Sequence, residues 1–302
     1  MSKYRLITRS DFDGLVCAMM LKELDMLEDI LFVHPKDMQD GMIDVCDTDI
    51  STNVPYQKGV HLAFDHHASE AKTRAVNYIN KPEAASCANV LYEYFGGAGK
   101  LKISKEIIEA VDKSDSAQYS YEDIVDPKGW VLLSYILDAR TGLGRFRNFR
   151  ISHSDLVIML VDYCSNHSID QILLHPDVKE RVEMYKAHQV LFENQLLEVS
   201  EVHGDTILIR LKNQEPIYVG NRFFIYALFP DAKVSIHEMW GLKKRNTVFT
   251  LGKSILNRTS NKDLARICKK HGGGGHKNAA TCQVPNGMAD EVLKDILVQL
   301  DA

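Results

Sequence analysis

The chain has 302 residues, of which 45% are hydrophobic and 25% are charged, and its formal net charge is −5. This composition is typical of a globular protein with two domains of ordinary size, and it excludes disordered and fibrous classes. Apolar runs of about eighteen residues, which a transmembrane helix needs, do not occur. The N-terminus also lacks the apolar core and the cleavage site of a signal peptide. We therefore expect a cytoplasmic protein with no membrane partner.

Six cysteines are spread along the chain without any Cys-x-x-Cys pair. This spacing argues against a zinc ribbon and against a disulfide framework. We expect reduced, mostly buried thiols at these positions, which are Cys17, Cys46, Cys87, Cys164, Cys268 and Cys282.

The charges are distributed unevenly. Residues 233–277 carry +9, whereas residues 1–232 carry −11 and residues 278–302 carry −3. An acidic body with a basic segment fits a domain that collects metal ions beside one that collects anions, because a field of one sign concentrates ligands of the other. A solvated basic face is an equally good interpretation of the charges alone.

Short apolar runs alternate with helical patterns in the first part of the chain. A helix is expected from about Leu15, and strands separated by helices predict an α/β domain with a mainly parallel sheet flanked by helices. In such a sheet the functional residues gather at the carboxyl ends of the strands. The expected strands are 4–8, 30–33, 42–46 and 60–64.

From residue 86 to about residue 199 the apolar spacing is helical, and its last amphipathic stretch is typical of a connecting helix. A second small α/β unit follows, with strands expected at 206–211, 232–237, 247–251 and 279–284 and a helix that opens at Asn261. We expect one domain at residues 1–180, a connecting helix or linker at 181–203, and a smaller C-terminal α/β domain at 204–302 across a cleft.

Acidic motifs follow three of the expected strands. Asp11 and Asp13 come after the first strand, Asp47 after the third, and Asp65-His66-His67 after the fourth. Carboxylate oxygens are hard ligands that suit Mg²⁺ or Mn²⁺. Asp-x-Asp-Gly alone is also a common turn sequence. The prediction of a metal site therefore depends on the coincidence of the motifs at one edge of the sheet.

The triplet Asp65-His66-His67 places a carboxylate and two imidazoles at one strand end. Adjacent histidines point in different directions on an extended backbone, so one turn of chain rarely gives both to the same ion. We assign His66 to the metal and His67 to the substrate phosphate or the reacting water. Asp65 would orient an imidazole through the ring N–H. A surface turn with chance histidines is the alternative for the triplet taken alone.

Four acidic motifs occur in order, namely Asp11-x-Asp13-Gly14, Asp47, Asp65-His66-His67 and Asp115 within Lys113-Ser114-Asp115-Ser116. They resemble the motifs of the DHH family of phosphoesterases, which includes RecJ-like exonucleases, oligoribonucleases, cyclic-dinucleotide phosphodiesterases and family II inorganic pyrophosphatases. The glycine run 272–275 with His276 and Lys277 resembles the signature of the DHH-associated C-terminal domain. The resemblance implies a catalytic, metal-binding domain at 1–180 and a substrate-binding domain at 204–302.

The resemblance also implies a set of metal ligands. Asp13, Asp47, His66 and Asp115 would hold one ion, and Asp11 with the bridging Asp47 would hold a second. Two ions about 3.5–4 Å apart would polarise phosphoryl oxygens and lower the pKa of a bridging water.

Two positions leave this ligand set open. Ile7 stands where pyrophosphatase-like and oligoribonuclease-like members have a histidine, so the second ion is weakly held, recruited with substrate, or absent. Asp112 competes with Asp115 as the ligand of the fourth motif. Asp115 is preferred because the run 107–111 then aligns best with the family.

The glycine run leaves backbone N–H groups unshielded, so that it can form a concavity for an anion. A flexible linker is the alternative, although the run lies between an expected helix and a strand-like stretch. Arg258 is suited to bidentate phosphate contact. The predicted substrate-binding residues are His67, Arg258, Gly273, Gly274, Gly275, His276 and Lys277. Loop 140–150, with four arginines and two aromatics, is interpreted as a basic surface loop or, alternatively, as a nucleic-acid contact.

These features predict a hydrolase that depends on Mn²⁺ or Mg²⁺, one or two ions, and cleaves linear dinucleotides or very short oligonucleotides to mononucleotides. The predicted catalytic residues are Asp65, His66 and His67. The alternatives are a phosphoanhydride hydrolase of the exopolyphosphatase or pyrophosphatase type, a cyclic-dinucleotide phosphodiesterase, and a non-catalytic nucleotide-binding module. The sequence does not decide between RNA and DNA, nor the oligomeric state, for which a homodimer is one option.

Overall fold

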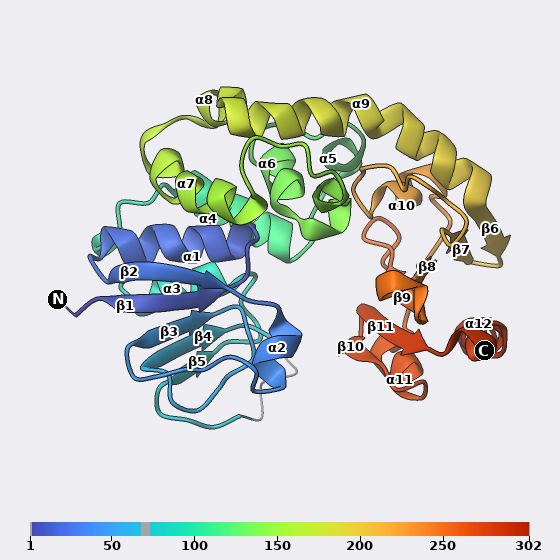
Figure 1. Ribbon diagram of the computed structural model, residues 1–302, viewed down its shortest axis with the longest axis horizontal. Helices are drawn as coiled ribbons and strands as arrows, with labels where there is room; N and C mark the ends of the chain where they lie inside the picture. Colours follow the sequence, from blue (N-terminus) through green and yellow to red (C-terminus); the bar gives the residue numbers. More distant parts are fainter. Residues whose placement is uncertain (1, 68–72, 302) are drawn as a thin grey trace. The chain divides into compact units, whose positions relative to one another are not determined.

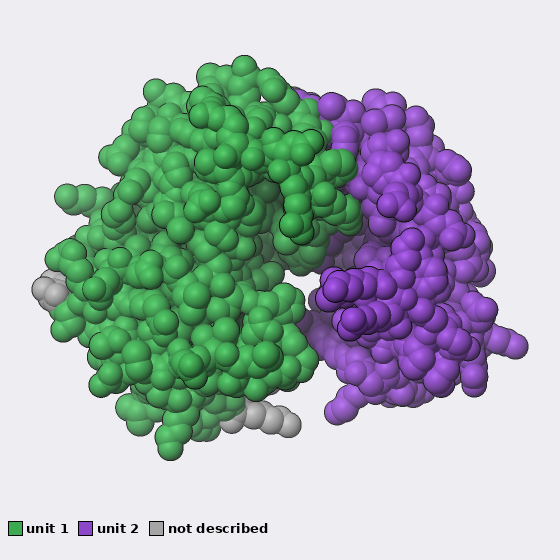
Figure 2. Space-filling model, in the orientation of Figure 1, with its two compact units in different colours: residues 1–119, 127–184 green, residues 120–126, 185–302 purple. Residues whose placement is uncertain are grey.

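The structure of the protein is a computed structural model that describes residues 2–67 and 73–301 (Figure 1). The chain divides into two compact units, which are coloured separately in Figure 2. Unit 1 consists of Met1–Tyr119 and Pro127–Met184, and unit 2 consists of Ser120–Asp126 and Tyr185–Ala302. The long helix α9 (Pro176–Val199) contains the point of division. The domain limits expected from the sequence stay a prediction.

Five parallel strands form the sheet of unit 1, which confirms the predicted α/β architecture (Figure 1). The strands are β1 (Tyr4–Thr8), β2 (Leu27–Phe32), β3 (Asp49–Thr52), β4 (Leu62–Asp65) and β5 (Tyr78–Asn80). Their order across the sheet is β2-β1-β3-β4-β5. The carboxyl ends of β1, β3 and β4 are therefore neighbours, and the residues that follow these strands meet at one edge of the sheet.

The third strand begins later than the sequence indicates. The expected strand at 42–46 is not formed, and β3 follows at Asp49–Thr52. Ile43 and Val45 are apolar for a different reason, because they pack beside buried Ile7 in a small hydrophobic cluster. Asp49 fixes β3 beside β1, since Arg5 donates two hydrogen bonds of 2.8 Å to its carboxylate. The residues directly after Cys46 therefore lie at the amino end of β3 instead of its carboxyl end.

Helix α1 (Phe12–Glu23) is the core helix of unit 1, because it is buried on all sides from Phe12 to Leu21. It packs against α3 (Cys87–Tyr94), α4 (Lys105–Asp115) and α7 (His153–Asn166). The other helices of unit 1 are α2 (Pro35–Gln39), α6 (Gly129–Leu137) and α8 (Ile169–Leu174), with the first part of α9. None of the helices that the structure describes is long and apolar enough to cross a membrane.

Unit 2 contains a six-stranded mixed sheet with the order β10-β11-β9-β8-β7-β6. Only β7 and β8 pair in parallel, and the other neighbours are antiparallel. Buried residues of β8, β9 and β11 form its core with α11 and α12. The elements are α5 (Tyr121–Val125), β6 (Ser200–His203), β7 (Thr206–Arg210), α10 (Phe224–Leu228), β8 (Val234–Trp240), β9 (Thr247–Lys253), α11 (Leu264–Lys269), β10 (Gly274–His276), β11 (Ala279–Val284) and α12 (Ala289–Asp301).

The glycine run forms an edge strand, which excludes the flexible-linker interpretation. Gly274, Gly275 and His276 pair antiparallel with β11. A Cβ atom on Gly273 would lie 2.2 Å from the Thr281 carbonyl oxygen, and Gly275 has a φ of +138°, a conformation that favours glycine. The close approach of β11 therefore accounts for glycine at positions 273 and 275.

Candidate metal centre and active site

The segment after β1 opens helix α1 with two aspartates in different environments. Asp11 is the N-cap, and its Oδ1 accepts a hydrogen bond of 3.0 Å from the Gly14 N–H. Asp13 lies in the first turn and is 2% exposed. A Cβ atom on Gly14 would lie 2.0 Å from the Arg9 carbonyl oxygen. Asp-x-Asp-Gly is therefore a tight connection from strand to helix that buries the second carboxylate.

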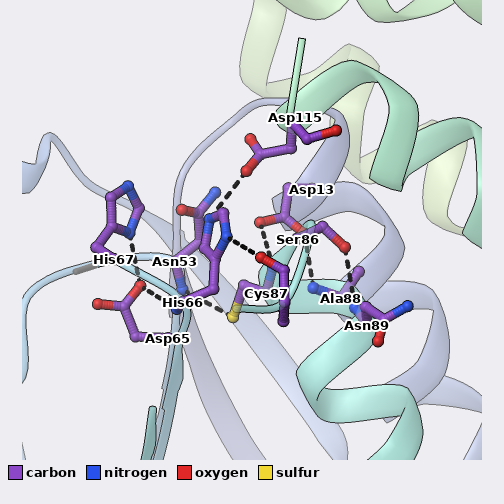
Figure 3. A network of polar contacts seen from close by, with 12 residues as sticks. Asp13, Asn53, Asp65, His66, His67, Ser86, Cys87, Ala88, Asn89 and Asp115 are labelled. Atoms are coloured by element: carbon purple, nitrogen blue, oxygen red, sulfur yellow. Dashed lines mark hydrogen bonds and ion pairs between the residues drawn. The ribbon is translucent and has the colours of Figure 1, made fainter. Parts of the chain in front are cut away.

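The buried carboxylate of Asp13 binds the N-terminus of α3. Its Oδ1 accepts a hydrogen bond of 2.7 Å from the Ala88 N–H, and its Oδ2 accepts one of 3.1 Å from the Cys87 N–H (Figure 3). The N–H groups at a helix N-terminus carry partial positive charge, which suits an anion. Burial raises the pKa of Asp13 well above its ordinary value, and the nearby charge of Asp115 raises it further. Ionised Asp13 is thus costly at this position unless a cation compensates it.

The ring of His66 faces Asp115 at the end of α4. His66 Nε2 lies 2.9 Å from Asp115 Oδ2 (Figure 3). On the other side of the ring, His66 Nδ1 lies 3.3 Å from the Ala84 carbonyl oxygen. Because a carbonyl oxygen only accepts, Nδ1 carries a proton, and Nε2 then faces the carboxylate with either a second proton or a shared cation. Burial lowers the pKa of His66, but the hydrogen bond with Asp115 and its charge raise the pKa to about 9.

Asp13, His66 and Asp115 form one compact cluster. Each of them offers one ligand atom, and these atoms all lie within 4.8 Å of one another. The cluster joins the first turn of α1, the residue after β4 and the last residue of α4, which are far apart in the sequence. Two carboxylates and one imidazole are a ligand set that Mn²⁺ accepts readily and Mg²⁺ tolerates. The donor atoms and their burial therefore fit a divalent cation.

Asp65 is buried at the end of β4 and orients His67. Its Oδ1 lies 2.7 Å from His67 Nδ1 and accepts a hydrogen bond of 2.9 Å from the His66 backbone N–H. Its Oδ2 accepts a hydrogen bond of 3.1 Å from the Tyr78 hydroxyl. The proton of the neutral His67 ring is thereby held on Nδ1, and the lone pair is on Nε2. Asp65 was expected to orient an imidazole, and the geometry assigns that imidazole to His67.

Asp112 and Asp115, the two candidates of the fourth motif, contact different partners. Asp112 accepts hydrogen bonds of 2.6 Å from the Ser86 hydroxyl and 2.7 Å from the Asn89 amide. It therefore ties α4 to the first turn of α3. Asp115 points to His66, so the geometry favours Asp115 as the ligand of this motif.

Two guanidinium groups lie near the cluster. The Nε of Arg9 is 3.0 Å from Asp11 Oδ2. Burial raises the pKa of Asp115, but the hydrogen bond with His66 and the charges of His66 and Arg9 make the net shift of this pKa downward. Arg140 is exposed and donates hydrogen bonds of 2.7 and 3.0 Å from Nε to the Asp138 carboxylate, and the charges of Asp138 and Asp11 raise its pKa. Loop 140–150 therefore brings its first arginine into the field of Asp11 and Asp115.

Besides Asp11, which caps α1 and pairs with Arg9, the predicted ligand outside the cluster is Asp47. It is exposed and lies in a turn before β3, at the opposite edge of the sheet from the cluster. Its assignment depended on a strand that ends at Cys46, and that strand is not formed. The residue that follows β3 at the carboxyl edge is Asn53, which sequence reasoning missed. The sequence signal that could have identified Asn53 is its position as a polar residue directly after the buried strand β3.

The other predicted substrate-binding residues lie in unit 2. Gly273 to Lys277 form β10 and its turn, and Arg258, in the loop after β9, donates a hydrogen bond of 2.9 Å to the Ile255 carbonyl oxygen. Burial lowers the pKa of Lys253, and the charge of Lys277 lowers it further. Two ammonium groups therefore lie near each other beside the glycine hairpin, an arrangement that attracts anions. Lys253 was missed because a lysine inside a basic segment has no distinguishing signal.

Comparisons with known proteins bear on the family. A scan against protein-family models found no match, and a search of curated proteins found none. Among solved structures, the pGpG-specific phosphodiesterase PggH from Vibrio cholerae is 48% identical, covers 99% of both chains and has a TM-score of 0.85.

More distant structures share the fold. The DHH domain of PF0399, described as a member of the s1p family of ribosomal proteins, is 12% identical with a TM-score of 0.62, covering 98% of this chain and 86% of that one. RecJ in complex with Mn²⁺ from Thermus thermophilus is 12% identical with a TM-score of 0.59, covering 98% of this chain and 52% of that one. With a phosphodiesterase relative along the whole length and the Asp13, His66 and Asp115 cluster at the carboxyl edge of the sheet, this chain belongs to the DHH family of phosphoesterases.

Proposed function

We propose that this enzyme hydrolyses pGpG, a linear guanine dinucleotide with a 5′-phosphate, to two molecules of GMP. The observation that carries the proposal is the 48% identity to a pGpG-specific phosphodiesterase over 99% of both chains. In the reaction the oxygen of one water bonds to the internal phosphorus, the bond from that phosphorus to the 3′-oxygen breaks, and the 3′-oxygen leaves with a proton. The sequence predicted cleavage of short linear nucleotides, and the proposal names pGpG as the specific substrate.

The cation of the proposal is held by Asp13, His66 and Asp115. When bound, a divalent cation supplies Lewis-acid chemistry, because it polarises phosphoryl oxygens and lowers the pKa of water. The carboxylates of Asp13 and Asp115 provide two negative charges that match the charge of one such ion. Mn²⁺ is the preferred ion of the proposal, since imidazole nitrogen is a better ligand for Mn²⁺ than for Mg²⁺.

Groups beside the cluster would act on the phosphodiester. Asp65 holds the His67 ring by a contact of 2.7 Å, which leaves the lone pair of Nε2 able to accept a hydrogen bond or a proton from the reacting water. Arg140 lies in the field of Asp11 and Asp115 and carries a permanent positive charge that would attract the substrate phosphate. These residues position the phosphate and the water before the reaction.

Unit 2 would bind the remaining part of the substrate. Lys253 and Lys277 place two positive charges near the glycine hairpin, and His276 and Arg258 belong to the same basic segment. In the proposal this segment binds the terminal phosphate of the dinucleotide and, through Gly273, Gly274 and Gly275, its base.

The experiment is a substrate panel with purified protein and Mn²⁺. The panel contains pGpG, pApA, cyclic di-GMP, oligonucleotides of increasing length and polyphosphate, and it is run beside Asp115→Asn and the matched control Asp47→Asn. The proposal expects GMP from pGpG at a rate well above all other substrates, lost in Asp115→Asn and kept in Asp47→Asn. Release of phosphate from polyphosphate with pGpG intact would contradict it, as would an active Asp115→Asn.

The cytoplasmic location and the homodimer remain predictions. Cell fractionation would test the first, and light scattering of the purified protein would test the second.

A further inference from the structure

Asn53 occupies the central position at the carboxyl edge of the sheet in unit 1. It directly follows β3, and β3 lies between β1 and β4, whose following segments supply Asp13 and His66. Its backbone N–H lies 3.2 Å from the Cys87 Sγ, and the Cys87 N–H in turn donates to Asp13. Figure 3 shows the Asn53 carboxamide on the same side of the strands as the His66 ring and the Asp115 carboxylate.

The carboxamide of Asn53 is buried without a hydrogen-bond partner among the described residues. The residue is 1% exposed, and within residues 2–67 and 73–301 neither its Oδ1 nor its Nδ2 has a partner. Burial of an amide without a compensating contact is destabilising, because the group loses its hydrogen bonds to water. Its φ of +56° is also unfavourable for residues other than glycine, asparagine and aspartate. A buried polar group kept at this cost indicates a ligand that the protein residues alone do not provide.

The charges near the cluster match one divalent cation. Asp13 and Asp115 are the carboxylates of the cluster, whereas Asp65 is engaged with His66, His67 and Tyr78. Asp11 is engaged with Arg9 and the Gly14 N–H, so its charge is already compensated. A second cation beside the first would repel it and would need a further anionic ligand between them.

We infer that the carboxamide oxygen of Asn53 is a fourth protein ligand, and that Asp13, Asn53, His66 and Asp115 together hold a single divalent cation. The inference rests on the proposed function in one respect, namely that the bound ion is a divalent cation. It does not depend on which substrate the enzyme cleaves. An amide oxygen is a neutral hard ligand, so it completes the ligand set without adding charge. The site is then electrically balanced with one ion and the neutral form of His66.

The test is a titration of Mn²⁺ into metal-free protein without nucleotide, followed by electron paramagnetic resonance of the unbound ion. Asn53→Gly removes the carboxamide and tolerates the positive φ, and Asn53→Ala is a second removal variant in case the glycine protein does not fold. Asp47→Asn is the matched control at the opposite edge of the sheet. Circular dichroism of the metal-free variants checks that each is folded.

The expected result is one Mn²⁺ per chain for the wild type and for Asp47→Asn, with a Kd that is about tenfold or more higher for the Asn53 variants. The visible absorption of bound Co²⁺ should also change in the folded Asn53 variants, because loss of a ligand changes the coordination. Two tightly bound ions in the wild type, or an unchanged Kd with an unchanged Co²⁺ spectrum, would overturn the inference. Failure of the protein to cleave pGpG would refute the proposed function and would leave these binding results unaffected.

Discussion

The two edges of the parallel sheet in unit 1 both carry buried carboxylates, and they compensate them differently. At the amino edge Asp49 is paired with Arg5 through two contacts of 2.8 Å, and its pKa is lowered: burial alone would raise it, but the hydrogen bonds from Arg5 prevail. At the carboxyl edge Asp13 accepts hydrogen bonds from two backbone N–H groups, and its pKa is raised by burial. A buried carboxylate with its own guanidinium needs nothing more, whereas one without it indicates a place for a cation.

The largest effect should come from removing a charge at the carboxyl edge. Asp115→Asn keeps the size of the side chain but removes one of the two negative charges of the cluster, so kcat on pGpG should fall by roughly 10³-fold. The measurement is steady-state hydrolysis at saturating Mn²⁺. Retention of more than a tenth of the wild-type kcat would show that this edge is not the catalytic one.

A smaller loss is expected when the orientation of His67 is disturbed. In Asp65→Asn the acceptor for the His67 Nδ1 proton is weakened, so kcat should fall by about 10- to 100-fold. Because His67 is not a member of the cation cluster, the Kd for Mn²⁺ should change much less than kcat. Equal losses in both quantities would place Asp65 in a purely structural role.

At the amino edge the same kind of change should affect stability and leave catalysis intact. Arg5→Ala leaves Asp49 buried without its guanidinium and should reduce the free energy of unfolding by about 2 kcal/mol, with kcat of the folded protein unchanged. Urea unfolding with a parallel activity assay measures both. A loss of kcat without a loss of stability would contradict the assignment of a structural role to the amino edge and a catalytic role to the carboxyl edge.

The pH dependence of this stability difference has a defined sign. The folded-state pKa of Asp49 lies below its unfolded-state value, so the stabilisation is complete above the unfolded pKa of about 3.9 and is lost as the pH falls through the folded pKa. The gap between wild type and Arg5→Ala should therefore be constant near neutral pH and shrink below about pH 4. A gap that widens in acid would contradict the ion pair.

The smallest effect is expected at Asp47. The residue is exposed at the amino edge, so Asp47→Asn should change the free energy of unfolding by less than about 0.5 kcal/mol and leave kcat unchanged. Thermal unfolding and the pGpG assay are sufficient tests. A large loss of activity would restore Asp47 as a ligand and refute its placement in the structure.

The sequence predicted most of the helices and strands, because apolar periodicity is a property of neighbouring residues in the chain. The order of the motifs can likewise be identified without the three-dimensional structure. Asp11, Asp13, Asp65, His66 and Asp115 were all placed after strands or on helices, and the structure brings Asp13, His66 and Asp115 together. The third strand was misplaced, because Ile43 and Val45 are apolar through packing in a loop and not through strand pairing.

Asn53 was missed for a reason that sequence reasoning could not remove. Its role depends on the strand order β1-β3-β4, which sets β3 between the two motif-bearing strands, and on a carboxamide that finds no hydrogen-bond partner in the described part of the chain. Both are properties of the folded chain. The tautomer of His67 could not be predicted from the sequence either, since it follows from the contact between His67 Nδ1 and Asp65 Oδ1 in the folded chain.

The proposed chemistry depends most on a cation at the carboxyl edge of the sheet, and anomalous diffraction at the manganese absorption edge tests it most directly. A crystal of the protein grown with Mn²⁺ should show one strong anomalous peak in unit 1, enclosed by Asp13, Asn53, His66 and Asp115. A crystal at full Mn²⁺ occupancy with no peak there, or with the peak beside Asp47, would contradict this assignment.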